Sequence, residues 1–115
     1  MLCRRYRLHS KHDYQYIMRR GAAYHTPFFI AFSFYAKVNK DSAFAGGVVC
    51  SKKVCSSAIG RNKIRRLLFD CLRSKLSVYP ANLRLILVAK QAMNKANYGQ
   101  VCAGFDQAIS KILVA

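Results

Sequence analysis

Residues 51–76 read SKKVCSSAIGRNKIRRLLFDCLRSKL, and this stretch decides the fold. Ser56 or Ser57 can cap a helix that runs from there to about Lys75 or Leu76. At 100° per residue, the apolar side chains of this helix fall within a sector of roughly 140°. They are Ile64, Leu67, Leu68, Cys71 and Leu72. A helix with one apolar face buries it against another layer, so we expect a sheet beneath this helix.

The remaining arc of the same helix is strongly cationic. Six Lys or Arg residues lie between Arg61 and Lys75, against one acid, Asp70. A helix whose charges only face solvent usually carries both signs, because opposite charges one turn apart stabilise it. Like charges one turn apart cost free energy, and the phosphates of a bound polyanion would offset that cost. A solvated basic face is the alternative interpretation, and it leaves the charge of the whole chain unexplained.

The composition of the chain favours a nucleic-acid partner. Its 115 residues carry 20 Lys and Arg against four acids, for a net charge of +16, while 53% of them are hydrophobic. That apolar fraction is too high for a disordered basic tail and suits a modest core, so residues 1–115 are predicted to form a single RNA-binding domain. Nucleic acid is favoured over an anionic membrane surface because release of counterions from phosphates rewards this composition.

The basic segment begins before the helix itself. Lys52 and Lys53 end an extended run and would lie close to the first turn of the helix, whose free N–H groups also favour a phosphate. The residues that we expect to bind RNA are Lys52, Lys53, Arg61, Asn62, Lys63, Arg65 and Arg66.

The segment upstream predicts a helix followed by an aromatic strand. Ser10 can cap the helix, Tyr14, Ile17 and Met18 follow at helical spacing, and Gly21 is a stop signal. The dense aromatic side chains of residues 27–37 then favour a strand. By its two-residue period, one face holds Phe28, Ile30, Phe32 and Phe34, and the other holds Phe29, Ala31, Ser33 and Tyr35. If helices cover only one face, the other could stack unpaired bases, so core and base-stacking roles both stay open.

The rest of the chain completes a mixed pattern. We expect a turn at Asn39–Ser42, an extended run at 44–50 whose paired glycines mark a bulge or a close approach, a strand at 83–89 and a helix over about 96–114. The order is therefore helix, strands, helix, strand, helix. This order predicts an α+β fold, a small two-layer sandwich of helices on a sheet.

Motifs for catalysis or metal binding by the protein are absent from the sequence. The four acids are scattered Asp residues, and the three His residues lack a matching nucleophile or metal-ligand spacing. We therefore expect no catalytic residue and no metal held by the protein alone. Five Cys without a Cys-x-x-Cys pair suit reduced thiols. Because no apolar run of about 18 residues occurs and no apolar stretch follows the N-terminal charges, we expect a cytoplasmic protein with no membrane partner.

The basic segment resembles a known family. Residues 51–53 (Ser-Lys-Lys), a spacer of seven residues and residues 61–66 (Arg-Asn-Lys-Ile-Arg-Arg) are similar to the signature of the bacterial ribonuclease P protein subunit. Arg7-Leu8 followed by Asp13-Tyr14 resembles the start of that family, and Gly21 stands where its first helix ends. The element order agrees too, so the resemblance covers about residues 5–113.

The resemblance implies a concrete function. Ribonuclease P removes the 5′ leader of precursor tRNA, and its RNA subunit is the catalyst and holds Mg²⁺ at the scissile phosphate. The small protein binds that RNA and the single-stranded leader, with one protein expected per RNA. By position, the basic residues of 61–66 would meet the catalytic RNA, Lys52 and Lys53 match the basic approach to the helix, and Tyr14 and Phe32 match aromatic positions of the leader-binding cleft. The resemblance also implies a mixed sheet of about four strands with a left-handed βαβ crossover, against the general preference.

Three positions depart from the family pattern. Lys63 stands where Arg is usual and lacks its planar, bidentate donor. Met18 occupies a position that is often aromatic, and residues 55–57 (Cys-Ser-Ser) replace a spacer that more usually contains Gly or Arg. A second functional class stays open: a ribosomal-type or single-strand RNA-binding protein without a linked reaction, which need not carry the joint signature.

Overall fold

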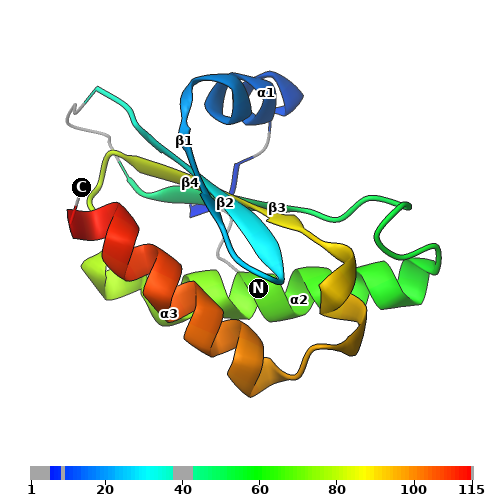
Figure 1. Ribbon diagram of the computed structural model, residues 1–115. Coiled ribbons are helices and arrows are strands. Elements are labelled where there is room, and N and C mark those ends of the chain that lie inside the picture. Colours follow the sequence, from blue (N-terminus) through cyan, green and yellow to red (C-terminus); the bar gives the residue numbers. More distant parts are fainter. Residues whose placement is uncertain (1–5, 9, 38–42, 115) are drawn as a thin grey trace.

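The computed structural model describes residues 6–8, 10–37 and 43–114. Its elements follow the predicted order of helix, strands, helix, strand and helix (Figure 1). They are α1 (Lys11–Arg20), β1 (Ala22–His25), β2 (Phe29–Tyr35), β3 (Ala45–Val49), α2 (Ala58–Ser74), the 3-10 helix η2 (Leu76–Val78), β4 (Leu83–Ala89), the 3-10 helix η3 (Gln91–Lys95) and α3 (Tyr98–Val114). The turn predicted at Asn39–Ser42 lies outside the described residues.

The four strands form one mixed sheet in the order β1-β2-β4-β3. β2 runs antiparallel to β1 and to β4, whereas β3 and β4 are parallel. α2 and α3 lie together on one face of the sheet, and α1 crosses the other face (Figure 1). The predicted α+β fold with a mixed sheet of four strands is confirmed, whereas the expected two layers omit α1, which adds a helix on the second face.

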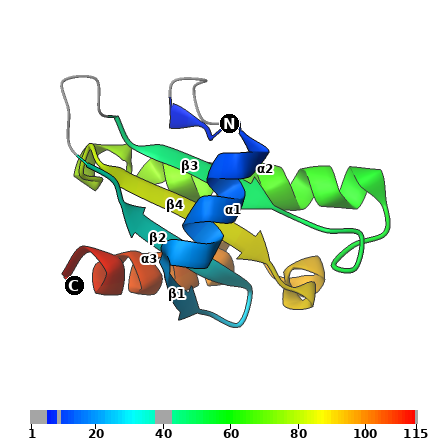
Figure 2. The ribbon, with the colours of Figure 1, turned by 90° about the horizontal axis from the view of Figure 1, so that it is seen from above.

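The connection between the two parallel strands has the handedness that the resemblance implies. β3 leads through α2 into β4, and α2 lies behind the sheet when α1 faces the viewer (Figure 2). With both strands turned to point upward in that view, the chain passes from β3 on the left to β4 on the right by way of a helix at the back, which is a left-handed crossover. It contradicts the strong right-handed preference of βαβ units. The first turns of α2 lie beyond the end of β3 (Figure 1).

The predicted helix starts are confirmed by their caps. The Ser10 hydroxyl accepts a hydrogen bond from the Asp13 N–H at 3.4 Å, and the Ser57 hydroxyl accepts one from the Gly60 N–H at 3.3 Å. α1 ends at Gly21 as predicted, but this glycine has an extended conformation. A Cβ on Gly21 would lie 2.6 Å from the Ser33 carbonyl oxygen, so the glycine is needed for the close approach of α1 to β2.

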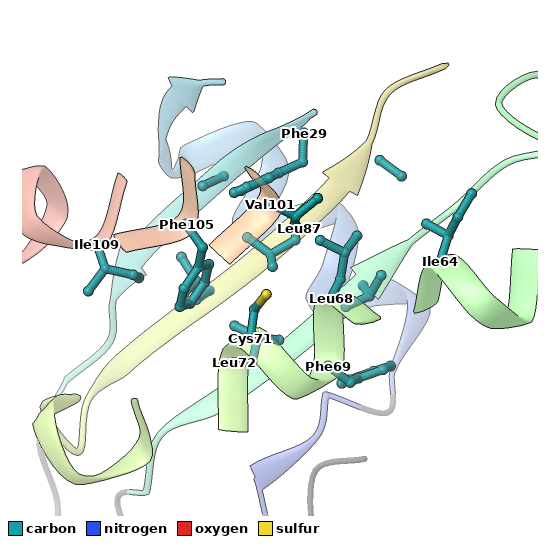
Figure 3. Close-up of a cluster of buried hydrophobic side chains, with 14 of the residues drawn as sticks. Phe29, Ile64, Leu68, Phe69, Cys71, Leu72, Leu87, Val101, Phe105 and Ile109 are labelled. Carbon is teal, nitrogen blue, oxygen red and sulfur yellow. The ribbon is translucent and has the colours of Figure 1, made fainter. Parts of the chain in front are cut away.

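The core lies between the sheet and the two helices on its far face. Leu83, Leu85 and Leu87 of β4 are fully buried there, and Leu68 and Leu72 of α2 belong to the same cluster. α3 contributes the residues predicted for its apolar face, which are Val101, Phe105, Ile109 and Ile112. Figure 3 shows side chains of the sheet, α2 and α3 meeting in this layer. One layer of apolar side chains thus leaves the polar arc of α2 to solvent.

β2 presents different residues to the two faces of the sheet. Its odd-numbered residues from Phe29 to Ser33 are buried toward the core, and its even-numbered residues, Phe32 among them, are half-buried on the face that α1 crosses. The placement of Phe28 with Phe32 is wrong. Phe28 precedes the strand in a turn where the Thr26 hydroxyl accepts hydrogen bonds from the N–H groups of Phe28 and Phe29. Phe28 therefore leaves the alternation and packs toward the core beside α3.

Candidate nucleic-acid interface

Four of the cations predicted to bind RNA are exposed and unengaged. Lys52 and Lys53 lie in the loop between β3 and α2, and Lys63 and Arg66 lie on the solvent side of α2. None of these four side chains has a hydrogen bond or an ion pair with another residue that the structure describes. We call these four residues the basic surface. Their charges are free to meet phosphates.

Arg61, also predicted to bind RNA, is half-buried and fastens the loop that carries the two lysines. Its Nη1 donates to the carbonyl oxygens of Cys55 at 3.0 Å and Ser56 at 2.9 Å. One guanidinium nitrogen is thereby committed to the protein. Arg61 shapes the interface as well as adding charge to it.

Asn62 and Arg65, the remaining predicted contacts, form a pair three residues apart on α2. Arg65 Nη1 donates to Asn62 Oδ1 at 3.2 Å, and Arg65 Nη2 donates to the Cys50 carbonyl oxygen at 3.5 Å. Because Cys50 directly follows β3, this second bond ties α2 to the sheet. Asn62 is exposed and Arg65 is half-buried, so the pair borders the basic surface and turns toward β3.

Two acids, Asp70 and Asp106, lie beside cations at the C-terminal end of α2. Asp70 lies 3.4 Å from Arg73, and Asp106 of α3 lies 3.6 Å from Lys75. The stretch of α2 from Ala58 to Phe69 contains no acid. The N-terminal half of α2 and the loop before it therefore present charge of a single sign.

A groove between α1, β3 and α2 adjoins this end of the molecule. Its volume is about 500 Å³, and its lining residues are Lys11, Tyr14, Val48, Val49, Cys50 and Arg65. The groove brings Tyr14, predicted for the leader-binding cleft, together with Arg65, predicted for the catalytic RNA. Two cations and an aromatic ring around one groove can contact both the phosphates and the bases of a single strand.

Tyr14 fits over β3 because Gly47 leaves room for its ring. A Cβ on Gly47 would lie 2.5 Å from Cζ and 2.6 Å from Cε1 of Tyr14. The close approach predicted for the paired glycines is therefore found here. Burial raises the pKa of the Tyr14 hydroxyl, and a backbone hydrogen bond at Val48 and the charge of Arg7 partly oppose that shift. The hydroxyl is a neutral group at physiological pH.

Phe32 lies on the same face of the sheet, in the same row of residues as Gly47. Ile86 of β4 pairs with Phe32 on one side and with Gly47 on the other. Phe32 and Gly47 are the ends of this row, two strand spacings of about 4.8 Å apart. Because Tyr14 lies over Gly47, Tyr14 and Phe32 lie on either side of Ile86, which is fully buried. We call Tyr14 and Phe32 the aromatic face. Phe32 does not line the groove of Tyr14, so the two rings are neighbours on one surface without sharing that groove.

Sequence reasoning missed an aromatic pair on the other flank of α1. The rings of Tyr16 and Phe34 meet edge to face with centroids 5.4 Å apart, and the Arg20 guanidinium lies 5.7 Å from the Tyr16 centroid. Tyr16 and Phe34 help to line a second hollow of about 340 Å³. The two-residue period of β2 places Phe34 on the same face as Phe32 and so could have predicted its role. Tyr16 falls on the polar side of the α1 pattern and carries no sequence signal.

The described residues contain neither a cluster of metal ligands nor a membrane-spanning helix. No group of three or more His, Cys, Asp or Glu side chains in the described ranges is placed to hold a metal ion. No described helix is long and apolar enough to cross a membrane.

Comparison with known proteins identifies the family of this chain. The family model described as Ribonuclease P matches residues 2–113. The chain belongs to the ribonuclease P family. The ribonuclease P protein component of Acidothermus cellulolyticus is 29% identical over 97% of this chain and 92% of its own length. That of a Nitratiruptor species is 31% identical over 92% of this chain and 87% of its own length.

Solved structures of family members share the fold. The RNase P protein of Staphylococcus aureus superposes with a TM-score of 0.78 at 22% identity, covering 93% of this chain and 94% of that one. The RNase P protein of Thermotoga maritima gives a TM-score of 0.74 at 17% identity, covering 88% and 92%. The resemblance predicted from residues 51–66 is confirmed as family membership.

Proposed function

We propose that this chain is the protein subunit of ribonuclease P. It binds the catalytic RNA and the 5′ leader of precursor tRNA and assists endonucleolytic removal of the leader, which gives the mature 5′ end. The observation that carries the proposal is the combination, in a member of this family, of free cations on one surface and a half-buried aromatic face beside it.

The basic surface is the proposed contact with the catalytic RNA. Lys52, Lys53, Lys63 and Arg66 have no competing partner in the described chain, so phosphates would replace only water around them. Each phosphate that they neutralise releases counterions, which makes the affinity fall steeply with salt. Asn62 and Arg65 extend this contact toward β3, and Arg61 holds its loop in place.

The aromatic face is the proposed contact with the leader. Tyr14 and Phe32 are half-buried, so each ring has one part packed on the sheet and another part free. An unpaired base stacked on such a ring contributes about 1–3 kcal/mol, with little preference for its identity. That tolerance suits leaders of different sequence. Lys11 at the adjoining groove would pair with a phosphate of the same strand.

The chemistry of cleavage belongs to the RNA in this proposal. No catalytic residue is assigned to the protein in this proposal, because the resemblance to the family places catalysis in the RNA subunit. Mg²⁺ is expected in the holoenzyme, held mainly by RNA, where it supplies charge stabilisation at the scissile phosphate. The protein contributes binding and orientation of the leader.

The partners follow from this role. They are ribonuclease P RNA and precursor tRNA, with one protein for each RNA and with the cytoplasm as the site of action. A single-strand or ribosomal-type RNA-binding protein without a linked reaction is the alternative. It would bind through the same cations, but it would not change the rate of leader removal.

Reconstitution separates these two functions. The protein is added to its cognate ribonuclease P RNA at low Mg²⁺, and leader removal from precursor tRNA is followed in a single turnover. We expect faster cleavage and a lower Mg²⁺ requirement than with the RNA alone. Tight RNA binding without any stimulation of cleavage would favour the alternative and overturn the proposal.

A further inference from the structure

The loop between β3 and α2 is held by an unbroken run of side-chain donors. Four consecutive carbonyl oxygens, those of residues 53–56, each accept a hydrogen bond from a side chain. Gln91 Nε2 donates to Lys53 at 3.1 Å, and Asn94 Nδ2 donates to Val54 at 2.6 Å. The next two carbonyls, of residues 55 and 56, accept from Arg61 Nη1 as described above.

The donors come from two distant parts of the chain. Arg61 lies in the first turn of α2, whereas Gln91 and Asn94 lie in η3, which follows β4. The η3 segment, gold in Figures 1 and 2, lies next to this loop in both views. Each peptide unit is planar, so fixing four consecutive carbonyl groups fixes the backbone between them. These four bonds tie the loop to α2 and to η3, although its residues 51–53 are exposed.

We propose that Gln91 and Asn94 are positioning residues that, together with Arg61, hold this loop so that Lys52 and Lys53 meet the phosphates of the RNA. The inference rests on the proposed function and assigns a role to η3 within it. Without these hydrogen bonds the loop would have to become ordered when the RNA binds. The entropy lost in that ordering would weaken the binding. The amides themselves need not touch the RNA.

The test uses the full chain and its cognate ribonuclease P RNA. The double variant Gln91→Ala with Asn94→Ala removes both amides, which are exposed and so can be replaced without opening the core. Affinity is measured across a series of salt concentrations. We expect the double variant to bind the RNA about tenfold more weakly. The slope of log affinity against log salt should be smaller in magnitude by about one to two, because each lost phosphate contact lowers that magnitude by about 0.9. Gln107→Ala is the matched control, since Gln107 is an exposed amide of α3 that lies beside β1.

A second background separates positioning from mere loss of stability. In a Lys52→Ala, Lys53→Ala protein, the η3 double variant should cause no further loss of affinity, because the groups that it positions are gone. A destabilised fold would instead lower the fraction of active protein in both backgrounds and leave the salt slope unchanged. An unchanged salt slope would overturn the positioning role of Gln91 and Asn94. Losses of affinity that add in the two backgrounds would overturn it as well. Failure of the unaltered protein to bind this RNA would contradict the proposed function itself.

Discussion

Replacing Gly47 with alanine tests the placement of Tyr14 over β3. The new Cβ would stand 2.5 Å from Cζ of Tyr14, about 1 Å inside an ordinary contact. The ring must tilt off the strand to relieve this overlap. Overpacking of this kind costs about 1–3 kcal/mol of unfolding free energy. The displaced ring would also intrude on the groove, so we expect weaker binding of leader-bearing precursor by the holoenzyme.

The same substitution should have the opposite sign when the ring is absent. No described glycine has a positive φ, so the backbone at Gly47 accepts alanine without strain. Alanine is favoured over glycine inside a strand by about 0.5–1 kcal/mol. In a Tyr14→Ala background, Gly47→Ala should therefore stabilise the protein. The preference for alanine is present in both backgrounds and cancels in their comparison, so the coupling energy equals the overpacking cost of about 1–3 kcal/mol.

A double-mutant cycle measures this coupling. Unfolding by urea is followed by far-ultraviolet circular dichroism, because the chain has no Trp to report by fluorescence. The four proteins are the unaltered chain, the two single variants and the double variant. Equal effects of Gly47→Ala in both backgrounds would show that Tyr14 does not occupy the space above Gly47, and would refute the reasoning.

Three further changes probe the aromatic face, the basic surface and the core. Phe32→Ala should weaken holoenzyme binding of leader-bearing precursor by about 1–3 kcal/mol while leaving mature tRNA unaffected; equal losses for both would assign Phe32 to the core. Arg66→Ala should lower the salt slope of RNA binding by about one, and an unchanged slope would remove Arg66 from the interface. Burial, and then the nearby Cys102 thiol, raise the pKa of Cys71 from 9.0 to about 12. The unaltered protein should therefore lose stability relative to Cys71→Ala as pH rises from about 9 toward 12, because the thiol ionises first in the unfolded chain; parallel stability curves would contradict this.

Most of the secondary structure was predictable from local signals. The cap at Ser57 and the strand at Leu83–Ala89 are where the sequence predicts them, because hydroxyl caps and buried alternation act within a few residues. The extended conformation of Gly21 was not predictable. It is set by β2 passing close to the end of α1, which is a contact between separate elements. Phe28 was misplaced for a similar reason, since the Thr26 turn interrupts the alternation just before the strand.

The candidate site was predictable as a set of residues but not as an arrangement. Charge patterning identified the basic residues of the segment, yet only the loop path reveals that Arg61 is bound to carbonyl oxygens while Lys63 is free. The register of β2, β4 and β3 sets Phe32 in one row with Gly47, and Tyr14 of α1 lies over that glycine. Gln91 and Asn94 carry no local signal, because their partners lie about 40 residues earlier in the chain.

Photo-crosslinking tests most directly whether the basic surface meets the catalytic RNA while the aromatic face meets the leader. Lys63 and Phe32 are replaced in turn by p-benzoylphenylalanine, and each protein is assembled with cognate ribonuclease P RNA and a precursor tRNA labelled in its leader. We predict that position 63 crosslinks to the catalytic RNA and that position 32 crosslinks to the leader. Crosslinks from position 32 to the catalytic RNA alone, or none from position 63 to that RNA in an active complex, would contradict the proposed division of the two surfaces.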